Sequence, residues 1–108
     1  MNSKSADISE GDPKVGAAAK FAALSHPARL EILRRLGGSS PCCCKDVVDH
    51  LDLAQSTVSQ HLKILVEAGL VRYAPQRPRS LYEINPEALS SLSSTLAAMV
   101  EDCCKPCR

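Results

Sequence analysis

Aromatic residues are scarce in this chain, which has no tryptophan and only Phe21, Tyr73 and Tyr82. A core of aliphatic residues and alanine suits packed helices, and 108 residues are enough for one domain. Long apolar runs are also missing: none approaches the ~20 residues that span a membrane, and the first residues are polar, unlike a signal peptide. We therefore expect a single cytoplasmic domain with no membrane partner, and with apolar surface left for a second copy of the chain.

A strong charge of one sign is missing as well, since the net charge is only +1. This balance alone does not indicate a nucleic-acid partner. Between residues 54 and 82, however, four Lys or Arg residues stand against a single Glu. Because a local basic face matters more for DNA than the total charge, this segment is the candidate for DNA contact.

The spacing of apolar residues predicts a mainly α-helical chain with one small β-hairpin. We expect helices over 15–24, from Pro27 to the Gly37-Gly38 stop, over 46–53, from 55 to about Ala68 and from Pro86 onward, and strands over 70–74 and 80–85. His26 and Asn85 are expected N-caps. The expected domains are a disordered tail over 1–13, one DNA-binding and dimerisation domain over 14–102 and a cysteine-rich tail over 103–108.

Residues 51–84 have the element order of a winged helix-turn-helix: a helix, a glycine stop and two strands. Val58, Leu62 and Leu65 form an apolar stripe, so polar side chains are left on the opposite face of a helix that fits a major groove. Pro75 and Pro78 stiffen the wing tip. The candidate DNA-binding residues are Gln55, Ser56, Thr57, Ser59, Gln60, His61 and Lys63 on the helix and Arg77 and Arg79 on the wing.

These residue types have distinct uses against DNA. Gln pairs bidentately with adenine, Ser and Thr serve a base or a phosphate, and Lys63 is better placed for phosphate. Arg77 and Arg79 suit a minor groove or the backbone. His61 lies beside the apolar stripe, which leaves three roles open: packing, a phosphate contact or a base contact. The alternative for the whole polar face is simple solvation.

All six cysteines fall into two tight clusters, Cys42-Cys43-Cys44 and Cys103-Cys104 with Cys107. Adjacent cysteines make awkward intramolecular bridges, so this usage fits a reducing compartment with metal-binding or reactive thiols better than a disulfide scaffold. Thiols clustered on a DNA-binding chain suggest a repressor that senses a soft metal or metalloid.

Two strings, LSHPARLEILRRL and QSTVSQHLKILVEAGLV, resemble the ArsR/SmtB family of metal-responsive winged-helix repressors over roughly residues 15–100. The resemblance implies a cytosolic homodimer, joined through its terminal helices, that binds a palindromic operator and releases it when metal or metalloid binds. Two positions depart from the family pattern. Ala54 replaces a capping Ser, typically a loss of about 1 kcal/mol, and Pro78 stands where glycine is common.

The inducer expected from the thiols is As(III) or Sb(III), because such an ion takes three soft thiolates in a pyramid, whereas structural Zn²⁺ takes four tetrahedral ligands. Our first choice is Cys103, Cys104 and Cys107. Cys103 continues the apolar stripe of the last helix, and Pro106 disfavours helix at the residue before it, so the chain can turn back. This site would lie at the end of an expected dimer helix.

The second choice is Cys42, Cys43 and Cys44, alone, with the partner chain, or mixed with the C-terminal set. Arsenic-sensing members of the family carry a CxCxxC-like set near here. Ungapped alignment places Cys43 on its first position but Lys45 on its second. The family's other zinc site, on the last helix, needs Asp and His, and residues 86–102 contain no His.

The rivals to an As(III) or Sb(III) repressor are the same fold responding to cadmium, lead, copper(I) or thiol oxidation. A structural zinc module is a further possibility. An enzyme is not expected, because no cysteine stands in the strand-to-helix setting that a redox motif or a phosphate-cradling loop requires.

Overall fold

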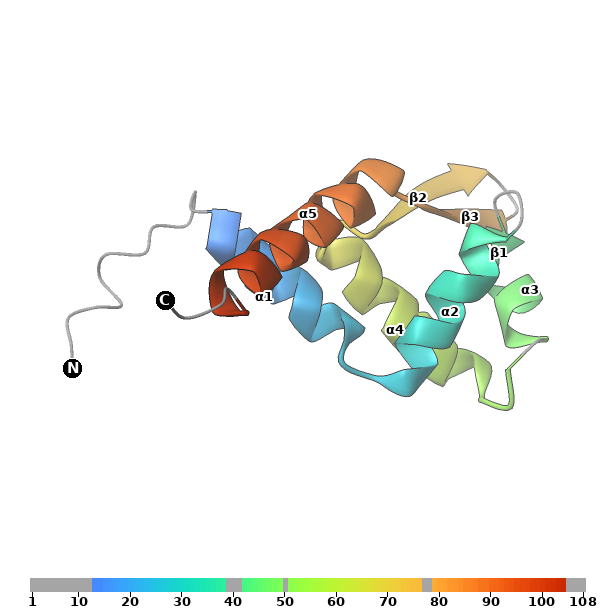
Figure 1. Cartoon of the computed structure of the whole chain (residues 1–108). Helices are drawn as coiled ribbons and strands as arrows, with labels where there is room; N and C mark the ends of the chain where they lie inside the picture. The colour runs from blue at the N-terminus through green and yellow to red at the C-terminus, as the bar shows by residue number, and fades with distance from the viewer. Residues whose placement is uncertain (1–12, 39–41, 50, 77–78, 105–108) are drawn as a thin grey trace, which may run out of the picture.

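The computed structural model describes residues 13–38, 42–49, 51–76 and 79–104 (Figure 1). In chain order the elements are α1 (Pro13–Leu24), α2 (Pro27–Gly37), β1 (Cys42–Cys43), α3 (Cys44–Val48), α4 (Gln55–Glu67), β2 (Val71–Gln76), β3 (Arg79–Ile84) and α5 (Pro86–Cys103). Within these ranges, no helix has the length and apolar character needed to cross a bilayer.

Aliphatic side chains from the helices and from the start of β2 fill the core. The stripe predicted on α4 is buried, with Val58, Leu62 and Leu65 at 0% exposure. They pack with side chains of α2, β2 and α5, among which Ile32, Leu36, Val71 and Leu92 are also buried. The periodicity of the sequence is thus confirmed as the source of the core.

Helix ends follow the expected caps with one exception. His26 Nδ1 accepts the Ala28 N–H at 3.0 Å and Asn85 Oδ1 accepts the Ala88 N–H at 3.3 Å, with a proline at the start of each helix. Ala54, at the N-cap of α4, makes no side-chain cap bond, as the sequence predicts. Gly69 ends the α4 segment with φ 86°, a conformation that favours glycine.

The sheet has three antiparallel strands in the order β1-β3-β2, so the expected hairpin gains a short strand that was not predicted. Cys42 pairs with Tyr82, and Tyr82 pairs with Tyr73 on the other side. Pro75, expected in the wing tip, lies within β2 opposite Ser80. Since β2 is an edge strand, a proline there need not remove a ladder hydrogen bond.

Two helices begin earlier than predicted. α1 starts at Pro13, inside the expected tail, and residues 1–12 lie outside the described residues. α3 was expected over 46–53 but runs from Cys44 to Val48, because Cys43 caps it: its N–H and its thiol both donate to Asp46 Oδ2 at 3.3 Å.

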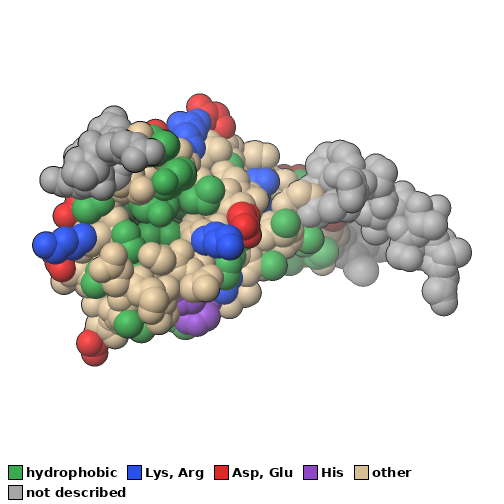
Figure 2. Space-filling view, turned by 180° about the vertical axis from the view of Figure 1, so that it is seen from behind, with side chains coloured by type: hydrophobic (Ala, Val, Ile, Leu, Met, Phe, Trp, Pro, Cys, Tyr) green, Lys and Arg blue, Asp and Glu red, His purple; other side chains and the backbone are tan. Residues whose placement is uncertain are grey.

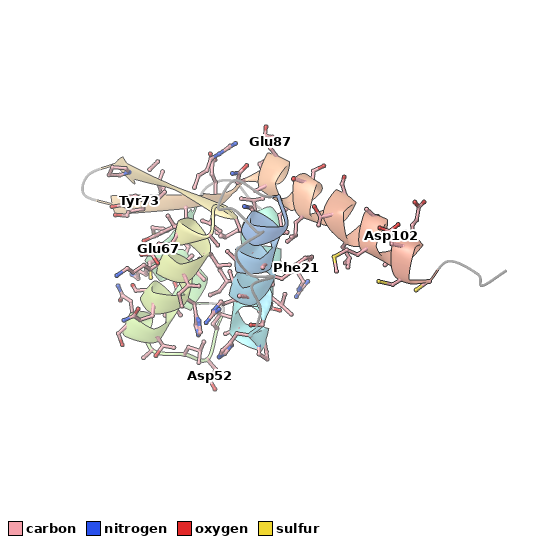
Figure 3. The ribbon with its side chains drawn as sticks, turned by 90° about the vertical axis from the view of Figure 1, so that its left-hand side faces the viewer. Phe21, Asp52, Glu67, Tyr73, Glu87 and Asp102 are labelled. Carbon is pink, nitrogen blue, oxygen red and sulfur yellow. The ribbon has the colours of Figure 1, made fainter. Side chains whose placement is uncertain are left out.

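α5 lies beside α1 and extends away from the rest of the molecule, from Glu87 next to the wing to Asp102 near its other end (Figures 1 and 3). Of its predicted stripe, Leu92 is buried, whereas Leu96 and Met99 are each 48% exposed. Cys103, assigned to the tail by sequence, closes the helix, and Cys104 is its C-cap.

Candidate nucleic-acid interface and thiol sites

The face of α4 opposite the core is open to solvent. Its exposed side chains are Gln55, Ser56, Thr57, Ser59, Gln60 and Lys63. They are held there because the buried stripe fixes the rotation of the helix about its axis. The structure therefore presents six of the predicted residues on one exposed surface, and their contact with DNA stays a prediction.

His61 differs from these six residues in its burial. Its side chain is 9% exposed and faces α2, where its ring centroid lies 4.5 Å from that of His26. Its Nδ1 accepts a hydrogen bond from Arg29 Nε at 3.1 Å. Of the roles left open by sequence, packing is the one that the structure favours.

The wing supplies fewer free charges than the sequence count suggests. Arg72 of β2 donates to Glu87 Oε1 at 2.7 Å and to Asn85 Oδ1 at 3.2 Å, so it ties the wing to the start of α5. Arg77 lies outside the described residues, and of Arg79 only the backbone, in β3, is described.

A polar cavity of about 630 Å³ separates α3, the start of α4 and β3. Its lining residues are Cys43, Cys44, Lys45, Asp46, Asp49, Gln55, Ser59, Ser80 and Tyr82. The Cys44 thiol is hydrogen-bonded to the Ser59 hydroxyl at 3.5 Å, while Cys43 is buried. Burial first, then the neighbouring Cys44 and Tyr73, raises the pKa of Tyr82. This thiol pair thus adjoins the exposed face of α4.

The C-terminal thiols are more exposed than those of Cys43 and Cys44. Cys103 and Cys104 are both exposed at the end of α5, far along the chain from α4. Cys107 and the side chain of Cys42 fall outside what is described. Among the described residues, no three His, Cys, Asp or Glu side chains converge on a metal position. Each predicted triplet has one member outside this set, so both triplets stay predictions.

Sequence reasoning missed several contacts at these sites. The Cys43–Asp46 cap had a signal, because a polar side chain followed three residues later by a carboxylate has capping-box spacing. The Arg29–His61, Arg72–Glu87 and Cys44–Ser59 contacts join residues 15 or more positions apart, and no local pattern announces them.

Three-helix packing around an exposed polar helix, followed by a β-hairpin, defines a winged helix-turn-helix DNA-binding protein. The family model described as "Bacterial regulatory protein, arsR family" matches residues 26–73. The arsenical resistance operon repressor of Staphylococcus xylosus is 37% identical over 73 residues, which cover 68% of this chain and 69% of that protein. The chain belongs to the ArsR family and is a DNA-binding transcriptional regulator, not an enzyme.

Solved structures agree on the fold. An ArsR-like transcriptional regulator from Rhodococcus sp. RHA1 is 26% identical with a TM-score of 0.74, and the match covers 82% of this chain and 83% of that one. A homodimeric winged helix-turn-helix DNA-binding domain from Mycobacterium bovis is 20% identical with a TM-score of 0.68, covering 94% and 89%. Both likenesses match the winged-helix arrangement described above.

Proposed function

We propose that this chain is a cytoplasmic homodimeric repressor that binds operator DNA through α4 and the β2–β3 wing. It releases that DNA when As(III) or Sb(III) is held by cysteine thiolates. The observation that carries the proposal is the presence of free thiols at two places on a winged-helix regulator, one beside α4 and one at the end of α5. Similarity to an arsenical resistance operon repressor supports the choice of metalloid.

The homodimer is supported by the apolar surface along α1 and α5. A groove of about 440 Å³ runs between them, lined mostly by apolar side chains that include Ala17, Phe21 and Met99. Leu96, Met99 and Val100 are each about half exposed. Figure 2 shows hydrophobic side chains reaching the surface at this end of the molecule. A second copy would remove this surface from water, which is favourable.

The C-terminal thiols are the first candidate for the inducer site. Cys103 and Cys104 are exposed and adjacent, as capture of a soft ion from solution requires. Cys107, three residues further along, would complete the pyramid. Because the pair ends a helix of the proposed dimer interface, ligand binding there would change the spacing of the two α4 helices. Such couplings typically amount to about 1–3 kcal/mol.

The thiols of Cys43 and Cys44 are the second candidate. Here the ligand would act on the DNA-binding surface directly, since Cys44 already contacts Ser59. Buried Cys43 would first have to give up its bond to Asp46. That cost favours the exposed pair for an ion arriving from solution.

The test is release of a fluorescent duplex, selected by the wild-type protein from a randomised library, as As(III) is titrated under reducing conditions. The variants are Cys103→Ser/Cys104→Ser and, as the matched pair, Cys43→Ser/Cys44→Ser. We expect wild type and the second variant to release DNA while the first stays bound. The opposite result would move the site beside α4, and loss of response in both would indicate a shared site.

A wild type that ignores As(III) and Sb(III) would refute the metalloid proposal. Cadmium, lead, copper(I) and peroxide, added to the same complex, then separate the remaining sensor classes. Release by peroxide that excess thiol reverses, without any metal, would identify a redox regulator.

A further inference from the structure

The buried histidine of α4 belongs to a cluster at the junction of three helices. Arg29 Nε donates to His61 Nδ1 at 3.1 Å, and the His26 ring packs on the His61 ring at 4.5 Å with a 55° tilt. Both partners come from the start of α2, and His61 lies at the edge of the buried face of α4, next to exposed Gln60. The cluster therefore contacts α4 beside its exposed face.

Arg29 also connects α4 to the helix beside the proposed dimer surface. Its Nη1 donates to the carbonyls of Ala23 at 3.2 Å and Ala22 at 3.4 Å, in the last turn of α1. The Ala22 carbonyl also accepts hydrogen bonds from the N–H and the hydroxyl of Ser25, at 3.1 and 2.7 Å. One guanidinium thus joins the end of α1, the start of α2 and α4.

The Arg29–His61 bond exists only while His61 is neutral. A neutral imidazole offers a lone pair at Nδ1, whereas the protonated ring has a donor there and would face another donor, Arg29. Burial first, then the charges of His26 and Arg29, lowers the pKa of His61. The folded protein therefore favours the neutral imidazole.

Other charged groups on the elements around α4 lie elsewhere. On α1, Lys20 reaches toward Gly69 beyond the end of α4. On β2, Arg72 is engaged by Glu87. The charges of α3 line the cavity in front of α4, and they are Lys45, Asp46 and Asp49. Among the described residues, His26 and Arg29 are therefore the groups that govern His61.

We propose that Arg29 and His61 are positioning residues for DNA binding, and that uptake of a proton by His61 breaks their contact and weakens operator binding. The inference rests on the proposed role of α4 as the DNA-contacting helix. Protonation would place a cationic His61 against the Arg29 guanidinium, and their repulsion would weaken the contact of α4 with α1 and α2. Acidification generally strengthens the binding of proteins to polyanionic DNA. A loss of affinity on acidification therefore distinguishes this mechanism from the general effect of charge.

The experiment measures the affinity of the full chain for the selected duplex by fluorescence anisotropy, from about pH 7.5 to about pH 5.5 at constant ionic strength. His61→Asn keeps an acceptor near the Nδ1 position but cannot titrate. Arg29→Gln keeps a neutral donor but removes the charge that opposes protonation. Circular dichroism at each pH verifies that every variant is folded.

Relative to His61→Asn, we expect wild type to lose affinity on acidification, by at most about tenfold per pH unit for one linked proton. Arg29→Gln should move this loss to higher pH, and it tests the idea independently if His61→Asn does not fold. His26→Asn, which preserves the cap of α2, should retain the loss. Parallel profiles for wild type and His61→Asn would overturn the proposal, as would disappearance of the effect in His26→Asn.

Gln60→Ala separates this inference from the proposed function. If that substitution leaves DNA binding unchanged, α4 is not the contacting helix and both ideas fail. If it weakens binding while the pH profiles stay parallel, the positioning role alone is refuted.

Discussion

The two faces of α4 differ in almost every property although they belong to one helix of 13 residues. On one face Val58, Leu62 and Leu65 are completely buried. On the other, polar side chains such as Ser59 and Gln60 are exposed. Ala54 provides no cap, so packing of the buried face is what holds the helix in place. Apart from the hydrogen bond between Ser59 and Cys44, the exposed face is therefore available to a ligand.

Of the substitutions that test the difference between the two faces, Leu62→Ala should have the largest effect. Removing a fully buried leucine lowers the free energy of unfolding by about 2–5 kcal/mol, since it removes apolar contacts and leaves a cavity. Urea denaturation followed by circular dichroism gives the value. A loss under about 1 kcal/mol would mean that the core can close around the gap, and that α4 is held by something other than its buried stripe.

Gln60→Ala should affect the opposite property. The exposed amide is free to pair with a base edge, and a bidentate contact contributes about 1–3 kcal/mol of discrimination. Affinity for the selected duplex should fall by that amount, with the free energy of unfolding changed by no more than about 0.5 kcal/mol. If stability falls instead, the exposed face has a structural role and the contrast between the faces disappears.

Ala54→Ser should strengthen the helix without touching either face. The backbone of Ala54 is already extended, with φ −67° and ψ 151°, which suits an N-cap. A serine there should raise the free energy of unfolding by about 1 kcal/mol, whereas Ala54→Gly should give nearly the same stability as serine, within a few tenths of a kcal/mol. Thermal unfolding of the three proteins tests this, and equal melting temperatures for serine and alanine would count against it.

Glu87→Gln should have the smallest effect. Its partner Arg72 is 49% exposed and Glu87 is 79% exposed, so solvent screens the pair. We expect the free energy of unfolding to change by less than about 1 kcal/mol, and less still at high salt. A larger, salt-insensitive change would show that the wing depends on this pair for its attachment to α5.

Local sequence patterns predicted those features of the fold that depend on residues close together in the chain. The spacing of Val58, Leu62 and Leu65 gave the buried face of α4, and Pro27 and Pro86 marked helix starts. The short strand β1 was missed because two cysteines have no strand periodicity, and pairing with Tyr82 alone defines it. Pro75 was placed in the tip because proline usually interrupts a ladder, whereas an edge strand tolerates it.

In the candidate site too, features set by neighbouring residues were predicted and contacts between distant residues were not. Six polar residues of α4 were found from the helical period, because that period determines which side chains share a face. His61 sits between the two faces, so period alone did not assign it, and its partner Arg29 is 32 positions away in the chain. Likewise, the cysteine spacing gave two thiol clusters but not that Cys44 would contact Ser59.

Because Cys44 contacts Ser59, the rate at which its thiol is alkylated can report whether DNA covers this part of α4. A thiol-specific alkylating agent reaches Cys44 through the cavity in front of α4, and DNA lying on Ser59 would close that route. Cys103 and Cys104, exposed at the end of α5, provide internal reference rates in the same sample. Mass spectrometry of labelled peptides would then report occupancy of the DNA surface at Cys44.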